Sequence, residues 1–210
     1  IALTTVAVGN GLVGKSSVIA LDTPAGTVRS RPTMEGTRVV RVSFENVPSF
    51  VLEKDLAVLG MSVDVAFGGA FYVIADSPFP IDGSHLPELR ELGMNLKSAV
   101  EKEREIVHPL EAGLRGIYGT IFCGPPRMEG STTRNVTVFA DAEVDRSPCG
   151  TGTCAVMAMR VQKGLLGDQD TFRHESIIGT VFEGRVLGRA RVGAIDAIIP
   201  EPLGGAHTDA

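Results

Sequence analysis

The stretch from Asp145 to Cys154 holds the residue types from which an acid/base site can be built. It reads Asp-Arg-Ser-Pro-Cys-Gly-Thr-Gly-Thr-Cys, and Cys149 stands directly before an apolar run that is typical of a buried helix. At such a position, unpaired backbone N–H groups and the positive end of the helix dipole favour a thiolate and lower the pKa of the thiol. The pattern predicts that Cys149 takes up and releases a proton.

Two further features of the same stretch suit an amino-acid substrate. Gly150 and Gly152 allow backbone N–H groups to approach a ligand closely, which favours a carboxylate. Asp145, four residues before Cys149, can hold a cationic nitrogen. Together these groups meet the needs of an enzyme that removes the α-proton of an amino acid. For a lone cysteine, a small buried apolar residue beside a glycine turn is the usual alternative. The spacing, together with an internal repeat, favours the catalytic interpretation.

Alternating helical and strand patterns must position these residues, and they predict an α/β protein. The predicted helices cover residues 1–8, 86–106 and 153–164, and Gly93 is expected to break the second. The predicted strands cover residues 18–21, 39–44, 50–52, 63–74, 117–122, 136–139, 177–182 and 192–199. Gly68 and Gly69 lie inside the strand at 63–74 and predict a bulge or a close backbone approach there.

The chain contains an internal repeat. Placing Gly11 on Gly164, an offset of 153 residues (164 minus 11), aligns the apolar helix at 1–8 with the helix after Cys149. The matches are Ala2 with Ala155, Val8 with Val161, Gly14 with Gly167, residues 26–28 with 179–181, and residues 38–39 with 191–192. This register predicts two pseudo-symmetric halves, each with a central helix wrapped by β-strands. We assign residues 1–46 plus 196–210 to the first half-domain and residues 47–195 to the second.

The repeat also makes a prediction about a partner for Cys149. The counterpart of the Cys149 motif falls just before Ile1. The chain opens on Ile-Ala-Leu-Thr-Thr-Val-Ala-Val, which has no initiator Met and is typical of the interior of a buried element. We expect a preceding segment that carries a matching reactive residue.

The motif from Asp145 to Thr153 resembles the second catalytic motif of the proline racemase and hydroxyproline epimerase superfamily. The resemblance continues through residues 21–26, 46–50, 66–72 and 174–179, so it covers nearly the whole chain. It implies an α/β fold of the diaminopimelate epimerase type, with the active site between two halves. It also implies that Cys149 is one of two acid/base residues, that Asp145 receives the nitrogen of a small imino acid, and that Gly150 and Thr151 bind its carboxylate. The first motif of the family, Met-Cys-Gly-His or a Ser variant, is expected upstream of Ile1.

The activity implied by this resemblance is inversion of the α-carbon of proline or 4-hydroxyproline without a cofactor. A thiolate removes the proton from one face while a thiol donates one to the other, and directed N–H groups stabilise the carbanion. An alternative in the same superfamily is trans-3-hydroxy-L-proline dehydratase, to which residues 117–121 and 134–141 are similar. Many dehydratases have Thr where this chain has Cys149. The intact motif disfavours a third class, a non-catalytic protein that keeps the fold only for binding. A homodimer is compatible with the resemblance.

Composition excludes several other classes of protein. The 210 residues carry a net charge of -5 with scattered basic residues, which disfavours nucleic acid as a partner. No apolar run reaches the roughly 20 residues that span a bilayer. Three cysteines without a recognisable secretory leader favour the reducing cytoplasm over a disulfide framework.

Several remaining residues allow weaker functional interpretations. Residues 9–16 match the P-loop pattern, but the residues after Ser16 are too few and too rich in β-formers for the required helix. Cys154 is expected in the core and Cys123 to be structural, and no Cys or His spacing matches a metal site. The three histidines expected to be surface or hydrogen-bonded structural residues are His85, His108 and His174. His174 cannot form a triad with its neighbours Glu175 and Ser176, because adjacent side chains of a strand point to opposite faces.

Overall fold

Twelve strands form one sheet among residues 1–14 and 18–205, which are the residues that the computed structural model describes. The helices are α1 (Ala2–Gly9), α2 (Leu86–Glu103) and α3 (Gly150–Gln162), with a 3-10 turn, η1 (Gly83–His85). The strands are β1 (Ile19–Thr23), β2 (Gly26–Glu35), β3 (Arg38–Glu45), β4 (Ser49–Val58), β5 (Met61–Phe67), β6 (Phe71–Asp76), β7 (Ile117–Gly124), β8 (Thr133–Phe139), β9 (Glu143–Asp145), β10 (Phe172–Ser176), β11 (Val181–Val192) and β12 (Ile195–Gly204). No helix within these described ranges combines the length and apolar character needed to cross a membrane.

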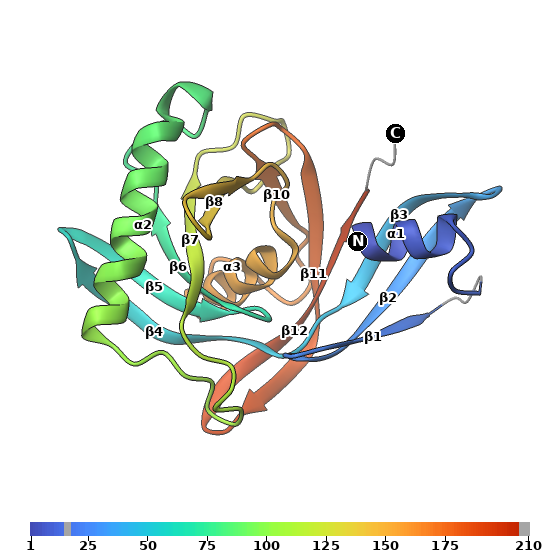
Figure 1. The fold of residues 1–210 in the computed structure, drawn as a ribbon, viewed down its shortest axis with the longest axis horizontal. Helices are drawn as coiled ribbons and strands as arrows, with labels where there is room; N and C mark the ends of the chain where they lie inside the picture. Colours follow the sequence, from blue (N-terminus) through green and yellow to red (C-terminus); the bar gives the residue numbers. More distant parts are fainter. Residues whose placement is uncertain (15–17, 206–210) are drawn as a thin grey trace.

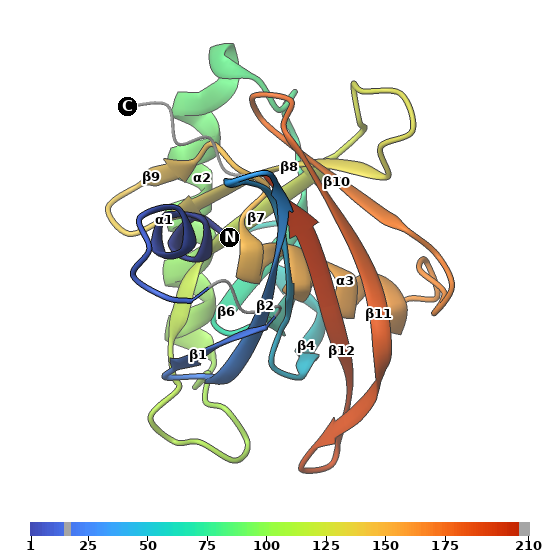
Figure 2. The same cartoon turned by 90° about the vertical axis from the view of Figure 1, so that its right-hand side faces the viewer.

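Strand β12 joins the two sides of the fold. The order along the sheet is β1-β2-β3-β12-β11-β10-β8-β7-β6-β5-β4, and β12 also pairs with β4. Figure 1 shows a small lobe of α1 with β1–β3 beside a larger lobe that contains α2 and α3, and β11 and β12 run between them. Figure 2 shows the same long pair β11–β12 from the side. The mixed α/β class is as predicted, whereas the division at residues 46 and 196 stays a prediction.

Helix α3 is the central helix of the larger lobe. Every residue from 152 to 159 is buried, because small and apolar side chains occupy all sides of the helix, and β4, β5, β6, β11 and β12 pack around it. The turn between β5 and β6 approaches the helix so closely that a Cβ at Gly68 would lie 2.1 Å from the Thr151 carbonyl oxygen. The predicted close backbone approach is therefore confirmed.

The repeat recurs in the hydrogen bonds that end the two apolar helices. After α1, Gly11 N donates to Val8 O at 3.1 Å and Leu12 N to Ala7 O at 2.8 Å. After α3, the bonds of the residues 153 positions later, Gly164 N to Val161 O and Leu165 N to Arg160 O, have the same lengths of 3.1 and 2.8 Å. Gly11 and Gly164 both adopt a left-handed backbone, with φ of 67° and 70°. Strands β1 and β10 also coincide at this offset, although the pairing register of β10 with β11 differs by one residue from that of β1 with β2.

Three of the predicted strands run across turns of the structure, the predicted helix 86–106 ends at Glu103, and the predicted strand 50–52 extends over Ser49–Val58. Residues 63–74 form the hairpin β5–β6 instead of one strand, because Gly69 turns the chain with φ of 111°. The predicted strands 177–182 and 192–199 straddle the turns at Gly179 and Gly193, whose φ values are 84° and 59°. Gly93 does not break α2; it is buried, and a Cβ there would lie 3.0 Å from Val138 Cβ, so a glycine is needed for packing.

Candidate functional site

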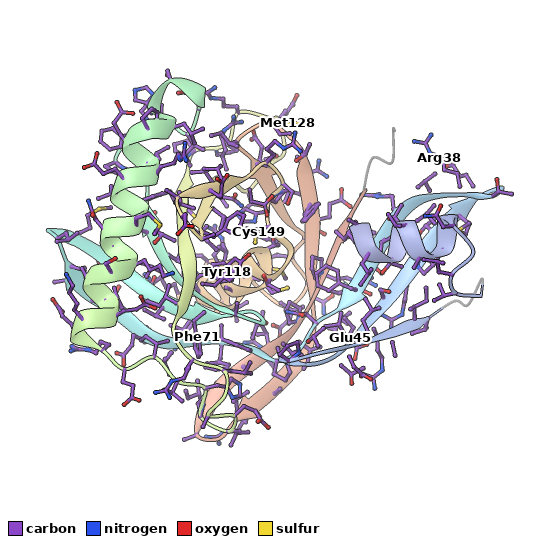
Figure 3. The ribbon with its side chains drawn as sticks, viewed as in Figure 1. Arg38, Glu45, Phe71, Tyr118, Met128 and Cys149 are labelled. Atoms are coloured by element: carbon purple, nitrogen blue, oxygen red, sulfur yellow. The ribbon has the colours of Figure 1, made fainter. Side chains whose placement is uncertain are left out.

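Cys149 stands at the first turn of α3 in a backbone conformation that is unusual for a residue with a side chain. It precedes the helix with φ of 64° and ψ of 118°, and Thr153 N donates to its carbonyl oxygen at 2.8 Å to begin the helix. A positive φ costs a non-glycine residue about 1 kcal/mol or more. Only 7% of the residue is exposed. The fold therefore holds the thiol in a strained and mostly desolvated position. Figure 3 labels Cys149 within the larger lobe.

Hydroxyl and backbone N–H groups surround the sulfur. Tyr72 Oη lies 3.6 Å from Cys149 Sγ and 2.6 Å from Thr151 Oγ1, and Thr151 Oγ1 lies 4.0 Å from the same sulfur. The N–H of Gly152 also donates to the thiol. A Cβ at Gly152 would lie 3.0 Å from Sγ, so the second glycine of the motif leaves room for the sulfur.

The pKa of the Cys149 thiol is raised, which differs from the predicted direction. Burial is the largest cause, because removal from water penalises the thiolate more than the thiol, and the charge of Asp145 raises the pKa further. Hydrogen bonds from Tyr72, Gly152 and Thr151 lower the pKa and oppose this effect. The prediction from the helix terminus alone was wrong because it did not include desolvation.

A cleft of ≈ 1170 Å³ opens beside the motif and is lined by both lobes. From the larger lobe, Asp145, Gly150 and Thr151 line it, whereas Cys149 is not among the lining residues and lies behind them as the chain neighbour of Gly150. The smaller lobe contributes Ile1 and Ala2 at the start of α1 and Phe44 of β3. A Cβ at Gly150 would lie 3.3 Å from Phe44 Cζ, so the first glycine of the motif allows the lobes to approach.

Asp145 ends strand β9, which pairs with β8. Its Oδ1 accepts a hydrogen bond from Ser147 N at 2.8 Å, and Ser147 Oγ accepts one from Cys149 N at 3.1 Å. The carboxylate thus fixes the chain that leads into Cys149 and still lines the cleft. The N–H groups of Gly150 and Thr151 belong to the first turn of α3, where no carbonyl of the helix can accept from them. These donors are available to an anion in the cleft.

Two tyrosines next to the thiol were not predicted as site residues. The ring of Tyr118 packs edge-on against Tyr72 at 5.6 Å between centroids and stacks on Phe139 at 5.5 Å. Burial, followed by the charge of Cys149, raises the pKa of Tyr72 well above its usual value, so its hydroxyl stays protonated. For Tyr72, the sequence offers only the pair Phe71-Tyr72 close to Gly69 as a signal. Nothing local in the sequence indicates that Tyr72 lies against residue 149.

The other candidate residues lie apart from the cleft lining. Cys154 is fully buried, and burial raises the pKa of Cys123 to about 12, which is the behaviour of core cysteines. His85 bonds to Asp82 on η1, and His108 packs against Phe50 and Phe67. Lys15 and Ser16 of the P-loop-like pattern lie outside the described residues. Within the described part of the chain, no group of three or more His, Cys, Asp or Glu residues could hold a metal ion.

His174 and its strand neighbours point in different directions, as predicted. His174 contacts Asn135 and Thr153 on the side of α3. Glu175 instead accepts from the N–H groups of Arg127 and Met128 and pairs with Arg134. A triad of adjacent residues is therefore absent at this place in the sheet.

Comparison with known proteins agrees with this arrangement. The family described as proline racemase matches residues 1–210. A trans-3-hydroxy-L-proline dehydratase from Bacillus thuringiensis is 43% identical over 216 residues, covering 98% of this chain and 65% of that protein. A 4-hydroxyproline 2-epimerase from Ancylobacter novellus is 39% identical over 220 residues, covering 98% of this chain and 64% of that protein. The chain thus spans slightly less than two thirds of the length of these relatives.

A solved structure gives the same result for the fold. The crystal structure of a hydroxyproline epimerase from Agrobacterium vitis, with bound trans-4-hydroxy-L-proline, superposes with a TM-score of 0.92 and 30% identity. The match covers 100% of this chain and 64% of that one. It confirms the expected α/β fold of the diaminopimelate epimerase type, with two pseudo-symmetric halves. With a family match over its whole length, this chain belongs to the proline racemase family.

Proposed function

We propose that the protein inverts the α-carbon of proline or a hydroxyproline, with Cys149 as one of two acid/base residues. The observation that carries the proposal is the position of the Cys149 thiol, fixed at the start of α3 beside a cleft lined by both lobes. A cysteine side chain can remove a proton from carbon as the thiolate and return one as the thiol.

The groups around the thiol suit the substrate of this reaction. The first-turn N–H groups of Gly150 and Thr151 bind the carboxylate, because helix N-termini favour anions. Asp145 holds the protonated ring nitrogen in the same cleft. In the proposed complex, these contacts bring the α-carbon near Cys149 Sγ. They also withdraw electron density from the α-carbon as negative charge develops on it.

The proton balance of the reaction needs two groups. The Cys149 thiolate takes the α-proton and becomes a thiol, and the resulting carbanion accepts a proton on its opposite face from a second acid, which becomes the new base. The repeat relates the start of α1 to the start of α3, and Ile1 and Ala2 line the same cleft. We place the second acid/base group at that wall, at the N-terminal end of α1.

Dehydration of trans-3-hydroxy-L-proline is the second candidate, favoured by the 43% identity to the Bacillus thuringiensis dehydratase. It begins with the same removal of the α-proton, but the electron pair then expels the 3-hydroxyl group, which leaves as water after protonation. Only one base is needed on the α-carbon. Cys149 favours inversion, because many dehydratases have Thr at this position.

The experiment that separates the candidates follows the α-proton by NMR in heavy water with the full-length protein. The substrates are L-proline, trans-4-hydroxy-L-proline and trans-3-hydroxy-L-proline. Deuterium in an inverted, otherwise intact ring supports the proposal and identifies the substrate. Loss of the 3-hydroxyl group with formation of a pyrroline acid would establish the dehydratase instead. Absence of reaction with all three compounds would overturn both candidates.

The role of Cys149 is tested with a matched pair of variants. Cys149→Ala should lower turnover by about 10³-fold or more, because the proton-transfer group is removed. Cys154→Ala removes a buried thiol from the same helix at a position outside the cleft lining, and it should retain turnover within about threefold of wild type. Equal turnover in wild type and Cys149→Ala would exclude the thiol from the reaction.

A further inference from the structure

A closed group of buried polar side chains lies behind the Cys149 loop. Asn135 of β8 and His174 of β10 are fully buried on neighbouring parallel strands, and Thr153 is fully buried on the first turns of α3. Asn135 Nδ2 donates to the carbonyl oxygen of Pro148 at 3.0 Å, and Thr153 Oγ1 donates to the same oxygen at 3.2 Å. Two donors from two different elements therefore hold the peptide bond that enters Cys149.

His174 connects these two donors. Its Nδ1 lies 2.9 Å from Thr153 Oγ1, and its Nε2 lies 2.6 Å from Asn135 Nδ2, which is also 3.0 Å from Nδ1. In the arrangement that these contacts favour, the Thr153 hydroxyl donates to Pro148 O and accepts from His174 Nδ1–H. Nε2 is then unprotonated and accepts from the second hydrogen of the Asn135 amide.

The peptide held by this group is the one that sets the conformation of the proposed catalytic residue. Cys149 has φ of 64°, which a residue with a side chain keeps only where the surroundings enforce it. The rotation that would relieve this strain moves the Pro148 carbonyl away from both donors. It would also move Sγ away from Tyr72 Oη and the Gly152 N–H, the groups that stabilise its thiolate.

We propose that His174, Asn135 and Thr153 are positioning residues that fix the Pro148–Cys149 peptide and so aim the Cys149 thiol. The proposal rests on the proposed function for its effect on turnover. It also has a readout that does not depend on turnover, because the titration of Cys149 follows from the position of the sulfur.

The variants are chosen to separate positioning from a loss of stability. Thr153→Val removes the donor to Pro148 O while keeping the shape of the side chain. Thr120→Val is the matched control, because Thr120 is fully buried and its hydroxyl donates to another backbone carbonyl, that of Gly93, at 2.7 Å. Thr153→Ser restores the hydroxyl, and His174→Gln keeps one donor and one acceptor in place of the ring.

Two measurements are made on the full-length variants. The first is kcat and KM on the substrate found in heavy water. The second is a pH titration of the cysteine Cβ signals by NMR in protein labelled with [3-¹³C]cysteine, in which Cys149→Ala and Cys154→Ala identify the signals. Thermal unfolding of each variant gives the stability for comparison.

We expect Thr153→Val to lower kcat by about tenfold or more with a smaller change in KM. We also expect it to shift the Cys149 titration beyond any shift in Thr120→Val. Thr153→Ser should restore both quantities, and His174→Gln should restore them in part. If Thr153→Val and Thr120→Val have the same Cys149 titration and the same kcat, the group is only structural and the proposal is overturned. If wild type turns over none of the substrates, the proposed function fails, while the titration still decides the positioning role.

Discussion

At the residue scale, the site combines a thiol that is hard to ionise with groups that make its ionisation possible. Burial raises the pKa of Cys149, whereas the hydrogen bonds of Tyr72, Gly152 and Thr151 lower it. The proposed acid/base role requires Cys149 to pass through both protonation states, and these hydrogen bonds favour the thiolate that burial disfavours. The hydroxyl of Tyr72 lies at the centre of this arrangement, within reach of both Cys149 and Thr151.

Tyr72→Phe tests this residue directly. Removal of the phenol takes away a hydrogen bond that lowers the pKa of Cys149, so the thiol pKa should rise. The alkaline shift in the pH profile should accompany a fall in kcat/KM of about tenfold, as for a hydrogen bond to a charged group worth about 1.5 kcal/mol. Tyr118→Phe removes a hydroxyl with no hydrogen bond to the thiol among the described residues, so it should leave the thiol pKa unchanged. A profile of Tyr72→Phe identical to wild type contradicts the assignment.

At the element scale, the start of α3 is positioned by contacts that leave no space for side chains. The β5–β6 turn lies on the first turns of the helix at Gly68, and Phe44 of β3 lies on Gly150. Glycine is required at position 68, where backbone atoms occupy the volume of a Cβ, whereas a Cβ at position 150 would make a tight contact of 3.3 Å with Phe44 Cζ. The helix terminus that carries Cys149 is thus defined by neighbouring elements from both lobes.

Gly68→Ala should destabilise the protein by about 3 kcal/mol, the upper range for overpacking, because its Cβ would lie 2.1 Å from the Thr151 carbonyl oxygen and 2.6 Å from Ala155 N. Gly113→Ala is the control, since a Cβ there meets nothing within 4 Å, and the change should stay within about 0.5 kcal/mol. Urea unfolding of both variants measures the difference. Equal midpoints for the two would show that the turn is free to move off the helix.

A buried ion pair fixes the loop that follows β7 to the end of β10. Arg134 pairs with Glu175, and Glu175 accepts from the backbone N–H groups of Arg127 and Met128. Breaking a buried pair leaves an uncompensated charge, so Glu175→Gln should cost about 3–5 kcal/mol in the free energy of unfolding.

The control for this pair is exposed. Arg115 and Glu105 lie 2.8 Å apart, but their side chains are 61% and 76% exposed. Glu105→Gln should therefore change the unfolding free energy by about 0.5 kcal/mol or less. A loss of stability for Glu175→Gln no larger than for Glu105→Gln in denaturant titrations would refute the assigned role.

At the scale of the whole molecule, two halves built on one plan enclose the cleft, and strand β12 connects them by pairing with β3, β4 and β11. The stability of the larger half depends on buried groups that must stay in one protonation state. Burial, followed by the charge of Arg160, lowers the pKa of His174 from 6.5 to about 3.

This shift predicts how stability depends on pH. The unfolded chain binds a proton at His174 below about pH 6.5, whereas the folded protein does not until about pH 3. The unfolding free energy should therefore fall as the pH falls through this window, by at most about 4–5 kcal/mol from this residue. Denaturant unfolding at a series of pH values should show that the unfolding free energy depends less steeply on pH for His174→Gln than for wild type. A slope unchanged in His174→Gln would contradict the prediction.

The local features of this protein can be read from the order of its residues. The apolar helix after Cys149, the glycines beside it and the offset of 153 residues between the halves all depend on residues that are close in the chain, or on identities repeated along it. The boundaries of strands were less well predicted, because the turns at Gly69, Gly179 and Gly193 interrupt apolar runs that continue on both sides.

Only the tertiary structure decided which distant residues meet at the site, and with what effect on the thiol. Tyr72 lies 77 positions before Cys149, and Asn135 and His174 belong to strands that become neighbours only in the folded sheet. Burial of the sulfur is likewise a property of the packed molecule, and it reversed the pKa direction that the helix terminus alone predicts. Hydrogen-bond partners and desolvation depend on contacts across the fold, whereas a sequence pattern records only the order of residues along the chain.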